Sequence, residues 1–223
     1  MKIIRWVVVS SFMFFIMAGV YAQNNQIGVI GGINIASVKM EKANIDIQNL
    51  IGMGIGGVLD FRFSESISWR FEPMYLLKGV RATATEDTIS MEQKLKFQYI
   101  EIPLFLKIAF GSTYIKPYVM AGASIGVLLS ANAEVHETGS DTQIDIKDVI
   151  NGIEYSAGFG GGISLSLGNY ALFVEGRYTI GVLNLFQDTS TIQIHGKEGK
   201  ITYIQPKNKG IQIFTGISMY LGN

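Results

Sequence analysis

The chain has 223 residues, no cysteine, and equal numbers of basic and acidic residues, 18 of each. Scattered charge without a net excess argues against nucleic acid as a partner. The lack of cysteine excludes disulfides, thiolate metal sites and a lipoprotein anchor. The mean hydropathy of +0.29 is high for a soluble domain, yet no run of 18 apolar residues after residue 22 predicts a transmembrane helix. These features favour a protein that crosses a membrane with strands.

The first residues predict a secretory signal peptide. Lys2 and Arg5 precede an apolar run that ends in a small-x-Ala cleavage sequence at Ala22. We expect cleavage after Ala22, so that 1–22 is the signal peptide and 23–223 is one exported domain. An uncleaved membrane anchor is the alternative, but the run is short and has no basic flank at its end. Without the signal peptide, 16 basic residues face 18 acidic residues.

The segment 51–63 shows the pattern that recurs along the exported part. Its odd positions are apolar except for a glycine at 57, whereas its even positions are small or charged and include Asp60 and Arg62. Side chains of a strand alternate between its two faces, so one face suits hydrocarbon and the other suits a polar interior. A helix here would contain four interior glycines, each costing about 1 kcal/mol relative to alanine. The segment is therefore predicted to be a strand.

Eight such segments follow one another, joined alternately by short turns and longer links. The expected strands are 26–38, 51–63, 67–78, 94–108, 115–130, 152–167, 170–182 and 211–221. The short turns lie at 64–66, 111–113 and 168–169, and the longer links at 39–49, 83–92, 136–149 and 186–208. This pattern predicts an all-β fold, an eight-stranded antiparallel up-and-down transmembrane β-barrel. We assign the side of the short turns and both termini to the periplasm, and the longer links to the cell exterior.

The segment 94–108 contains an apparent change of phase. Phe97 and Tyr99 continue the apolar face of its first half, whereas Ile100 begins the apolar face of its second half. A β-bulge adds one residue to a strand and exchanges its faces, so we expect a bulge between Tyr99 and Ile100. Pro103 lacks the amide hydrogen of a ladder bond and agrees with a local irregularity.

Aromatic residues gather near both expected rims of the barrel. Those near the short turns are Phe61, Phe63, Trp69, Phe71, Phe110 and Tyr170, and those near the longer links are Phe97, Tyr99, Tyr155 and Tyr178. Two interfacial girdles of this kind are typical of outer-membrane barrels.

The expected inward face carries five acidic and six basic side chains. They are Asp60, Arg62, Arg70, Glu72, Lys78, Glu101, Lys107, Lys116, Glu154, Glu175 and Arg177. Eight strands leave a lumen that side chains just fill, so we expect a plugged, ion-paired core without an open channel. Inward glycines would make room for Phe105, Tyr118, Phe173 and Phe214. We favour a structural charge network over a proton or ion pathway.

The sequence offers no clear catalytic, cofactor or metal site. The only histidines, His136 and His195, fall in expected links without serine and carboxylate partners at a spacing that argues for a triad. The aspartates of 141–148 do not have the spacing of a calcium loop, and the glycines of 160–162 lack the lysine and helix of a phosphate loop. We therefore expect neither enzyme activity nor a cofactor.

Four stretches resemble the small outer-membrane β-barrel proteins of the Bacteroidota, the porin-family or PorT-like group. They are GVIGGINIAS at 28–37, FQYIEIPLFLKI at 97–108, KPYVMAGASIGVLLSA at 116–131 and GGGISLSLGNYALFVEGRYTIGVLNL at 160–185. The most specific element is tyrosine-x-glutamate-x-proline, here Tyr99, Glu101 and Pro103. One departure is the end of the chain, Tyr220-Leu221-Gly222-Asn223, because such barrels commonly finish on an aromatic residue.

The resemblance implies an outer-membrane location in a Gram-negative envelope and an eight-stranded barrel, and some relatives serve a secretion apparatus linked to gliding. We therefore expect a structural or interaction component. The expected partners are outer-membrane lipid, the barrel-assembly machinery and an unidentified envelope protein, and the chain is expected to be a monomer. A narrow passive porin and a barrel enzyme acting on lipid or peptide are the alternatives. A soluble lipocalin-like binder is disfavoured because its apolar face would point inward.

Overall fold

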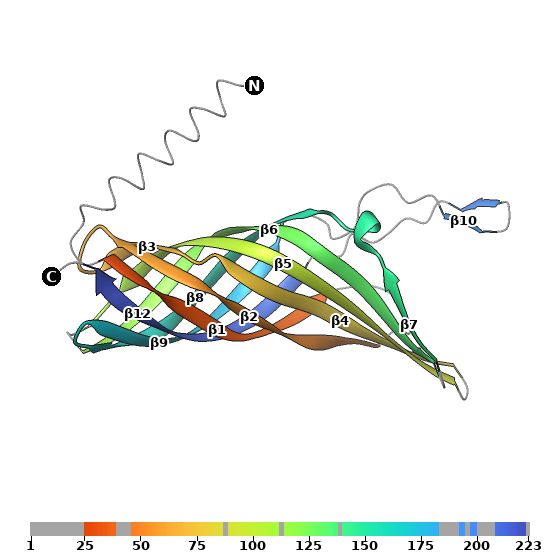
Figure 1. Cartoon of the computed structure of the whole chain (residues 1–223), viewed down its shortest axis with the longest axis horizontal. Coiled ribbons are helices and arrows are strands. Elements are labelled where there is room, and N and C mark those ends of the chain that lie inside the picture. The colour runs from red at the N-terminus through yellow and green to blue at the C-terminus, as the bar shows by residue number, and fades with distance from the viewer. Residues whose placement is uncertain are drawn as a thin grey trace, which may run out of the picture.

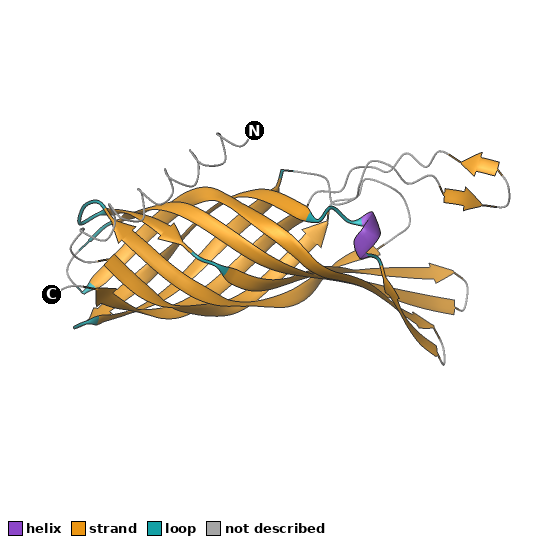
Figure 2. Ribbon diagram, turned by 45° about the horizontal axis from the view of Figure 1, so that its top comes forward, coloured by secondary structure: helices purple, strands orange, loops and turns teal. Residues whose placement is uncertain are grey.

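The computed structural model describes residues 25–38, 46–86, 89–111, 114–137, 140–182, 192–194, 197–199 and 208–221. Long antiparallel strands wind around one closed barrel (Figures 1 and 2). The strands of the wall are β1 (Asn25–Val38), β2 (Asp46–Arg62), β3 (Ile67–Phe71), β4 (Met74–Glu86), β5 (Ile89–Ala109), β6 (Ile115–Glu137), β8 (Ile153–Leu167), β9 (Tyr170–Gly181) and β12 (Asn208–Leu221). Outside the wall are β7 (Ser140–Asp145), the short 3-10 helix η1 (Lys147–Val149), β10 (Ile192–Ile194) and β11 (Lys197–Gly199).

The wall is a ring of eight antiparallel positions. Both β3 and β4 pair with β2 and with β5, so together they fill one position of the ring. β1 pairs with β12 along its whole length, from Asn25 opposite Leu221 to Val38 opposite Asn208. This pairing closes the sheet, and the eight-stranded antiparallel barrel predicted from the sequence is confirmed.

The outer face of the wall is apolar and the inner face is charged. In β2, Ile51, Met53 and Ile55 are 65 to 67% exposed, whereas Asp60 is 1% exposed. A soluble protein shows the opposite arrangement, and an apolar perimeter of this kind suits a lipid environment. No helix within the described ranges is long and apolar enough to cross a membrane.

The three short turns lie together at one end of the barrel, called here the short-turn end, where β1 begins and β12 ends (Figure 1). Gly111 and Gly168 occupy two of these turns with φ of +94° and +63°, a conformation that side chains with a Cβ rarely adopt. In the third turn the Ser64 hydroxyl oxygen accepts hydrogen bonds from the backbone amides of Ser66 and Ile67. The opposite end is called the loop end.

The strands at the loop end are longer than predicted. β4 continues to Glu86 and β5 starts at Ile89, so most of the expected link 83–92 is a strand hairpin that projects beyond the barrel. β2 starts at Asp46, and the expected link 136–149 contains the end of β6, β7 and η1. The expected links 83–92 and 136–149 contain few large apolar residues, which is why the sequence did not identify them as strands. Most of the expected link 186–208 lies outside the described residues.

The predicted reversal of faces in β5 is wrong. Phe97 and Tyr99 are both 1% exposed, and Ile100 is 39% exposed, so odd positions face inward through this part of β5. Phe97 and Tyr99 therefore belong to the interior, and only Tyr155 and Tyr178 remain of the girdle expected near the longer links.

The irregularity between β5 and β6 instead places the extra residue in β6. Gln98 lies opposite Ser130 and Tyr99 lies opposite Leu128, which leaves Leu129 without a partner in the register. Leu129 is 43% exposed on the outer face. The bulge predicted in β5 is therefore absent, and the extra residue of β6 was not predicted.

The wall has a second irregularity where β3 ends and β4 begins. Glu72 and Pro73 separate these strands, directly beside Pro103 of β5. The Glu72 amide donates to the Pro103 carbonyl oxygen at 3.1 Å, and the Gly57 amide of β2 donates to the Pro73 carbonyl oxygen at 2.9 Å. The irregularity expected beside Pro103 thus includes an interruption of the adjacent strand.

Candidate functional site

Arg70 lies at the centre of the barrel interior. It projects from β3 and is 1% exposed. Its Nε and Nη2 atoms each donate to one carboxylate oxygen of Asp60 at 2.8 Å, and Asp60 is its register partner on β2. Its Nη1 atom donates to Glu175 Oε2 at 2.6 Å, and Lys107 Nζ donates to Asp60 Oδ2 at 3.0 Å. Paired, fork-shaped contacts of this kind are the strong form of a charge-assisted hydrogen bond.

Arg177 of β9 completes the same network. Its Nη1 atom donates to Glu72 Oε2 at 2.6 Å, and its Nη2 atom lies 3.0 Å from Glu175 Oε1. The Tyr118 hydroxyl donates to Glu175 Oε2 at 2.6 Å. We call Asp60, Arg70, Glu72, Lys107, Tyr118, Glu175 and Arg177 the central network. Its three carboxylates balance its three cations, so burial does not leave an uncompensated net charge.

Aromatic rings fill the space around the central network. The Arg70 guanidinium lies 4.6 Å from the centroid of the Phe173 ring, and the Arg177 guanidinium lies 4.6 Å from that of Phe214. Such cation–π contacts stabilise a cation that has left water. A Cβ on Gly54 would lie 2.8 Å from Phe214 Cε1, so the ring occupies the space that the missing side chain leaves.

A second cluster lies nearer the loop end. Lys78 Nζ lies 2.8 Å from Glu101 Oε2 and 3.2 Å from Glu154 Oε1. Ser124 Oγ donates to Glu101 Oε1 at 2.9 Å. One cation therefore faces two carboxylates, and with both carboxylates ionised this cluster carries one negative charge in contrast to the neutral central network.

The segment that follows β7 covers the interior at the loop end. Ile150 is 1% exposed and packs with Phe97, Tyr99 and Leu128. The amide of Ile146 donates to the carbonyl oxygen of Ala131 in β6 at 2.9 Å, which holds the segment against the wall. This apolar cover explains why Phe97 and Tyr99 point inward.

The structure places the eleven charged residues of the expected inward face at two levels of burial. Nine are buried, namely Asp60, Arg70, Glu72, Lys78, Glu101, Lys107, Glu154, Glu175 and Arg177. Arg62 and Lys116 are half-buried at the short-turn end. The sequence did not indicate that Tyr118 would bond to Glu175 or that Ile150 would cover the interior. The only sequence indication that Tyr118 would join the charge network was its hydroxyl group at a position expected to face inward.

The structure describes only some of the residues that could suggest catalysis or metal binding. His136 lies in β6 and not in a link, and His195 lies outside the described residues. Asp145 lies in β7 and accepts a hydrogen bond from the Lys147 amide, and the glycines of 160–162 belong to β8. Among the described residues, no group of three histidine, cysteine, aspartate or glutamate side chains could hold a metal ion.

A closed ring of eight strands with an apolar outside and an ion-paired inside defines the class of transmembrane β-barrels. The sequence profile of the family described as "Outer membrane protein beta-barrel domain" matches residues 21–187. The chain belongs to this family and is an outer-membrane protein.

Several solved outer-membrane proteins are similar to this chain at low sequence identity. Ail, the attachment invasion locus protein of Yersinia pestis, is 12% identical with a TM-score of 0.42, over 89% of this chain and 100% of that chain. Neisserial surface protein A is 16% identical with a TM-score of 0.43, over 88% and 97%. OprG from Pseudomonas aeruginosa is 10% identical with a TM-score of 0.45, over 90% and 97%. No curated protein matches the sequence.

Proposed function

We propose that this protein is a closed outer-membrane barrel that serves as a structural or interaction component and does not conduct solutes. The contact between Arg70 and Glu175 carries the proposal. β3 and β9 are four positions apart in the ring of eight, so this 2.6 Å contact crosses the full diameter of the barrel. Glu72 and Arg177 bridge the interior in the same direction at 2.6 Å. A solute would have to break both ion pairs in order to pass.

The closed interior predicts that the protein does not conduct ions. The refolded protein in a planar lipid bilayer is expected to show no steady single-channel openings, because the central network and the segment around Ile150 obstruct the lumen at two heights. Single-channel recording measures this directly, with gel mobility before and after heating as the check that the barrel is folded. Steady openings from folded protein would reject the closed interior in favour of the narrow porin.

The long hairpins at the loop end are the surface that we propose for an interaction with an envelope partner. β4, β5, β6 and β7 extend beyond the barrel at this end (Figure 2). The short turns offer little comparable surface. We propose that the loop end faces the cell exterior, because outer-membrane barrels place their longer connections there.

The proposed orientation predicts which insertions are accessible on intact cells. An epitope tag inserted at 87–88 should bind antibody on intact cells, and a tag inserted between Gly168 and Asn169 should bind only after the outer membrane is opened. Both sites join antiparallel strands, so each insertion lengthens a connection without interrupting a strand. Cell-surface immunofluorescence compares the two, and the opposite pattern would reverse the orientation.

The finer assignment is the PorT-like group, with a role beside secretion or gliding components. The Tyr99, Glu101 and Pro103 element supports it. We further propose that the protein is a monomer that contacts outer-membrane lipid and is inserted by the barrel-assembly machinery after cleavage behind Ala22. Loss of secretion or gliding when the gene is deleted, restored by the intact gene, would support this role. Normal secretion and gliding in the deletion strain would remove it. No observation among the described residues favours a catalytic role.

A further inference from the structure

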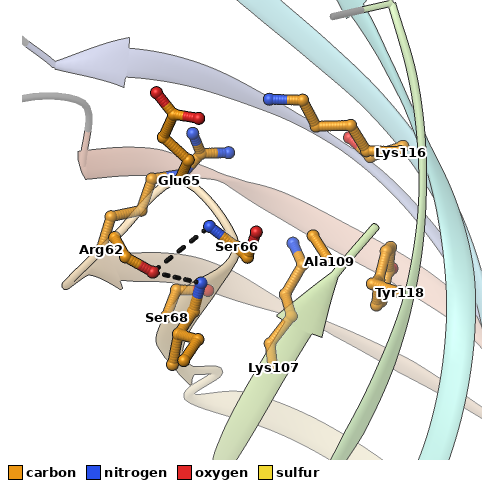
Figure 3. A pocket seen from close by; sticks show the side chains of 11 residues that line it. Arg62, Glu65, Ser66, Ser68, Lys107, Ala109, Lys116 and Tyr118 are labelled. Atoms are coloured by element: carbon orange, nitrogen blue, oxygen red, sulfur yellow. Dashed lines mark hydrogen bonds between the residues drawn. The ribbon is translucent and has the colours of Figure 1, made fainter. Parts of the chain in front are cut away.

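A small hollow opens at the short-turn end, beside the central network. It is lined by the turn between β2 and β3, the end of β5, the start of β6 and the end of β8. Three cationic side chains line it, Arg62, Lys107 and Lys116, together with one carboxylate, Glu65 (Figure 3). Lys107 is already paired with Asp60, so Arg62 and Lys116 against Glu65 leave the lining with an excess of one positive charge at the mouth of an otherwise ion-paired interior.

Two of these cations have no acidic partner among the residues that the structure describes. Arg62 has a cation–π contact with Tyr220, 5.4 Å from the ring centroid, and its guanidinium forms no ion pair within the described part of the chain. Lys116 Nζ makes neither a hydrogen bond nor an ion pair with any described residue. Each of the buried cations deeper in the barrel pairs with at least one carboxylate, as Lys107 does with Asp60. The mouth therefore differs from the rest of the interior.

Two serine hydroxyls in the same hollow have no hydrogen-bond partner among the described residues. Ser68 of β3 is 6% exposed and Ser164 of β8 is 9% exposed, and both line the hollow. Ser164 is the register partner of Lys116, so the two side chains lie on the same face. Neither hydroxyl oxygen is sealed from solvent, so both can donate a hydrogen bond to an acceptor in the hollow, beside the two cations.

We propose that this hollow binds an oxyanion of the phosphate type. Cations and hydroxyl donors on one small surface are complementary to a ligand whose oxygen atoms accept hydrogen bonds and carry negative charge. Arg62 and Lys116 supply charge, whereas Ser68 and Ser164 donate hydrogen bonds. The ligand is free phosphate or the phosphate monoester of a larger molecule, because both present the same group to the hollow.

Binding of inorganic phosphate tests the proposal. The full mature protein is refolded in a maltoside detergent, which carries no phosphate of its own, and titrated with sodium phosphate by calorimetry against sodium chloride at equal ionic strength. We expect saturable binding of phosphate and no saturable binding of chloride. Arg62→Gln and Lys116→Gln should each weaken the affinity by about tenfold, the loss expected for one charge-assisted hydrogen bond. Glu65→Gln should strengthen binding, because it removes the only carboxylate of the lining.

The matched control is Lys147→Gln, which removes an exposed cation of η1 at the loop end and should leave the affinity unchanged. All variants are first checked for folded gel mobility. Absence of saturable binding, equal binding of chloride, or equal weakening by Lys147→Gln would overturn the proposal. Glycerol phosphate distinguishes the two sources: binding of both compounds supports a monoester ligand, and binding of inorganic phosphate alone supports the free ion.

Discussion

Replacing Arg70 with methionine is expected to destabilise the folded barrel by about 3 to 5 kcal/mol, the range for breaking a buried ion pair by removing one partner. The change leaves Glu175 with the Tyr118 hydroxyl and Arg177, and it leaves Asp60 with Lys107 as its remaining cation. Methionine keeps much of the volume, so the lost charge dominates the effect. Urea unfolding in lipid vesicles, followed by tryptophan fluorescence, measures the free energy of unfolding.

The control for Arg70→Met is Lys96→Met on the outer side of β5. Lys96 Nζ lies 2.7 Å from Glu134 Oε1, but the two side chains are 45% and 25% exposed. Removing this pair should cost less than about 1 kcal/mol, because exposed ion pairs contribute little. Similar losses in the two variants would show that the central network is no more important to stability than a surface pair.

Gly54→Val is expected to destabilise the barrel by roughly 1 to 3 kcal/mol, the usual cost of adding volume to a packed core. The Cβ of a residue at position 54 would lie 2.8 Å from Leu76 Cδ1 and 2.8 Å from Phe214 Cε1. Both obstacles are side-chain atoms, so a smaller residue in place of Phe214 should relieve the clash. The loss in the Gly54→Val, Phe214→Leu double variant should therefore be smaller than the sum of the two single losses.

The control for Gly54→Val is Gly176→Val on the lipid-facing side of β9. A Cβ on Gly176 meets no atom within 4 Å among its described surroundings, and valine is favourable in strands. Its free energy of unfolding should stay within about 0.5 kcal/mol of the parent. The same urea titration is applied to the parent protein, Gly54→Val, Phe214→Leu, the double variant and Gly176→Val. Additive losses in the double variant would mean that Phe214 is not what excludes a side chain at position 54.

The wall of the barrel could be predicted from the sequence because lipid imposes a strict period of two. Charged residues such as Asp60 and Arg177 cannot face hydrocarbon without a large cost, so their parity fixed the inward face of each strand. The same parity identified all nine charged residues that are buried in the described part of the chain. Which acid contacts which base was not predictable, because it depends on the order of positions around the ring and on strand stagger.

Two features were not predicted correctly from the sequence, because their surroundings differ from those of the barrel wall. Phe97 and Tyr99 were assigned to lipid on hydrophobicity, but they lie beneath Ile150, which is far from them in the sequence. The projecting hairpins contain few large apolar residues, so the sequence did not distinguish them from links. The extra residue at Leu129 of β6 was not predicted, because only the strand register reveals it.

Pro103 lies directly beside the gap between β3 and β4, and this position affects the mechanical strength of the wall. The nitrogen and the carbonyl group of a strand residue point to the same neighbouring strand. The Pro103 carbonyl oxygen accepts a hydrogen bond from the Glu72 amide, so the Pro103 nitrogen also faces the gap between β3 and β4. This nitrogen carries no hydrogen and cannot donate a bond there. The cylinder has a seam with one lateral bond fewer at this height. Elastic deformation should concentrate along this seam, and amide protons beside it should exchange with deuterium sooner than those of the continuous ladder between β1 and β12.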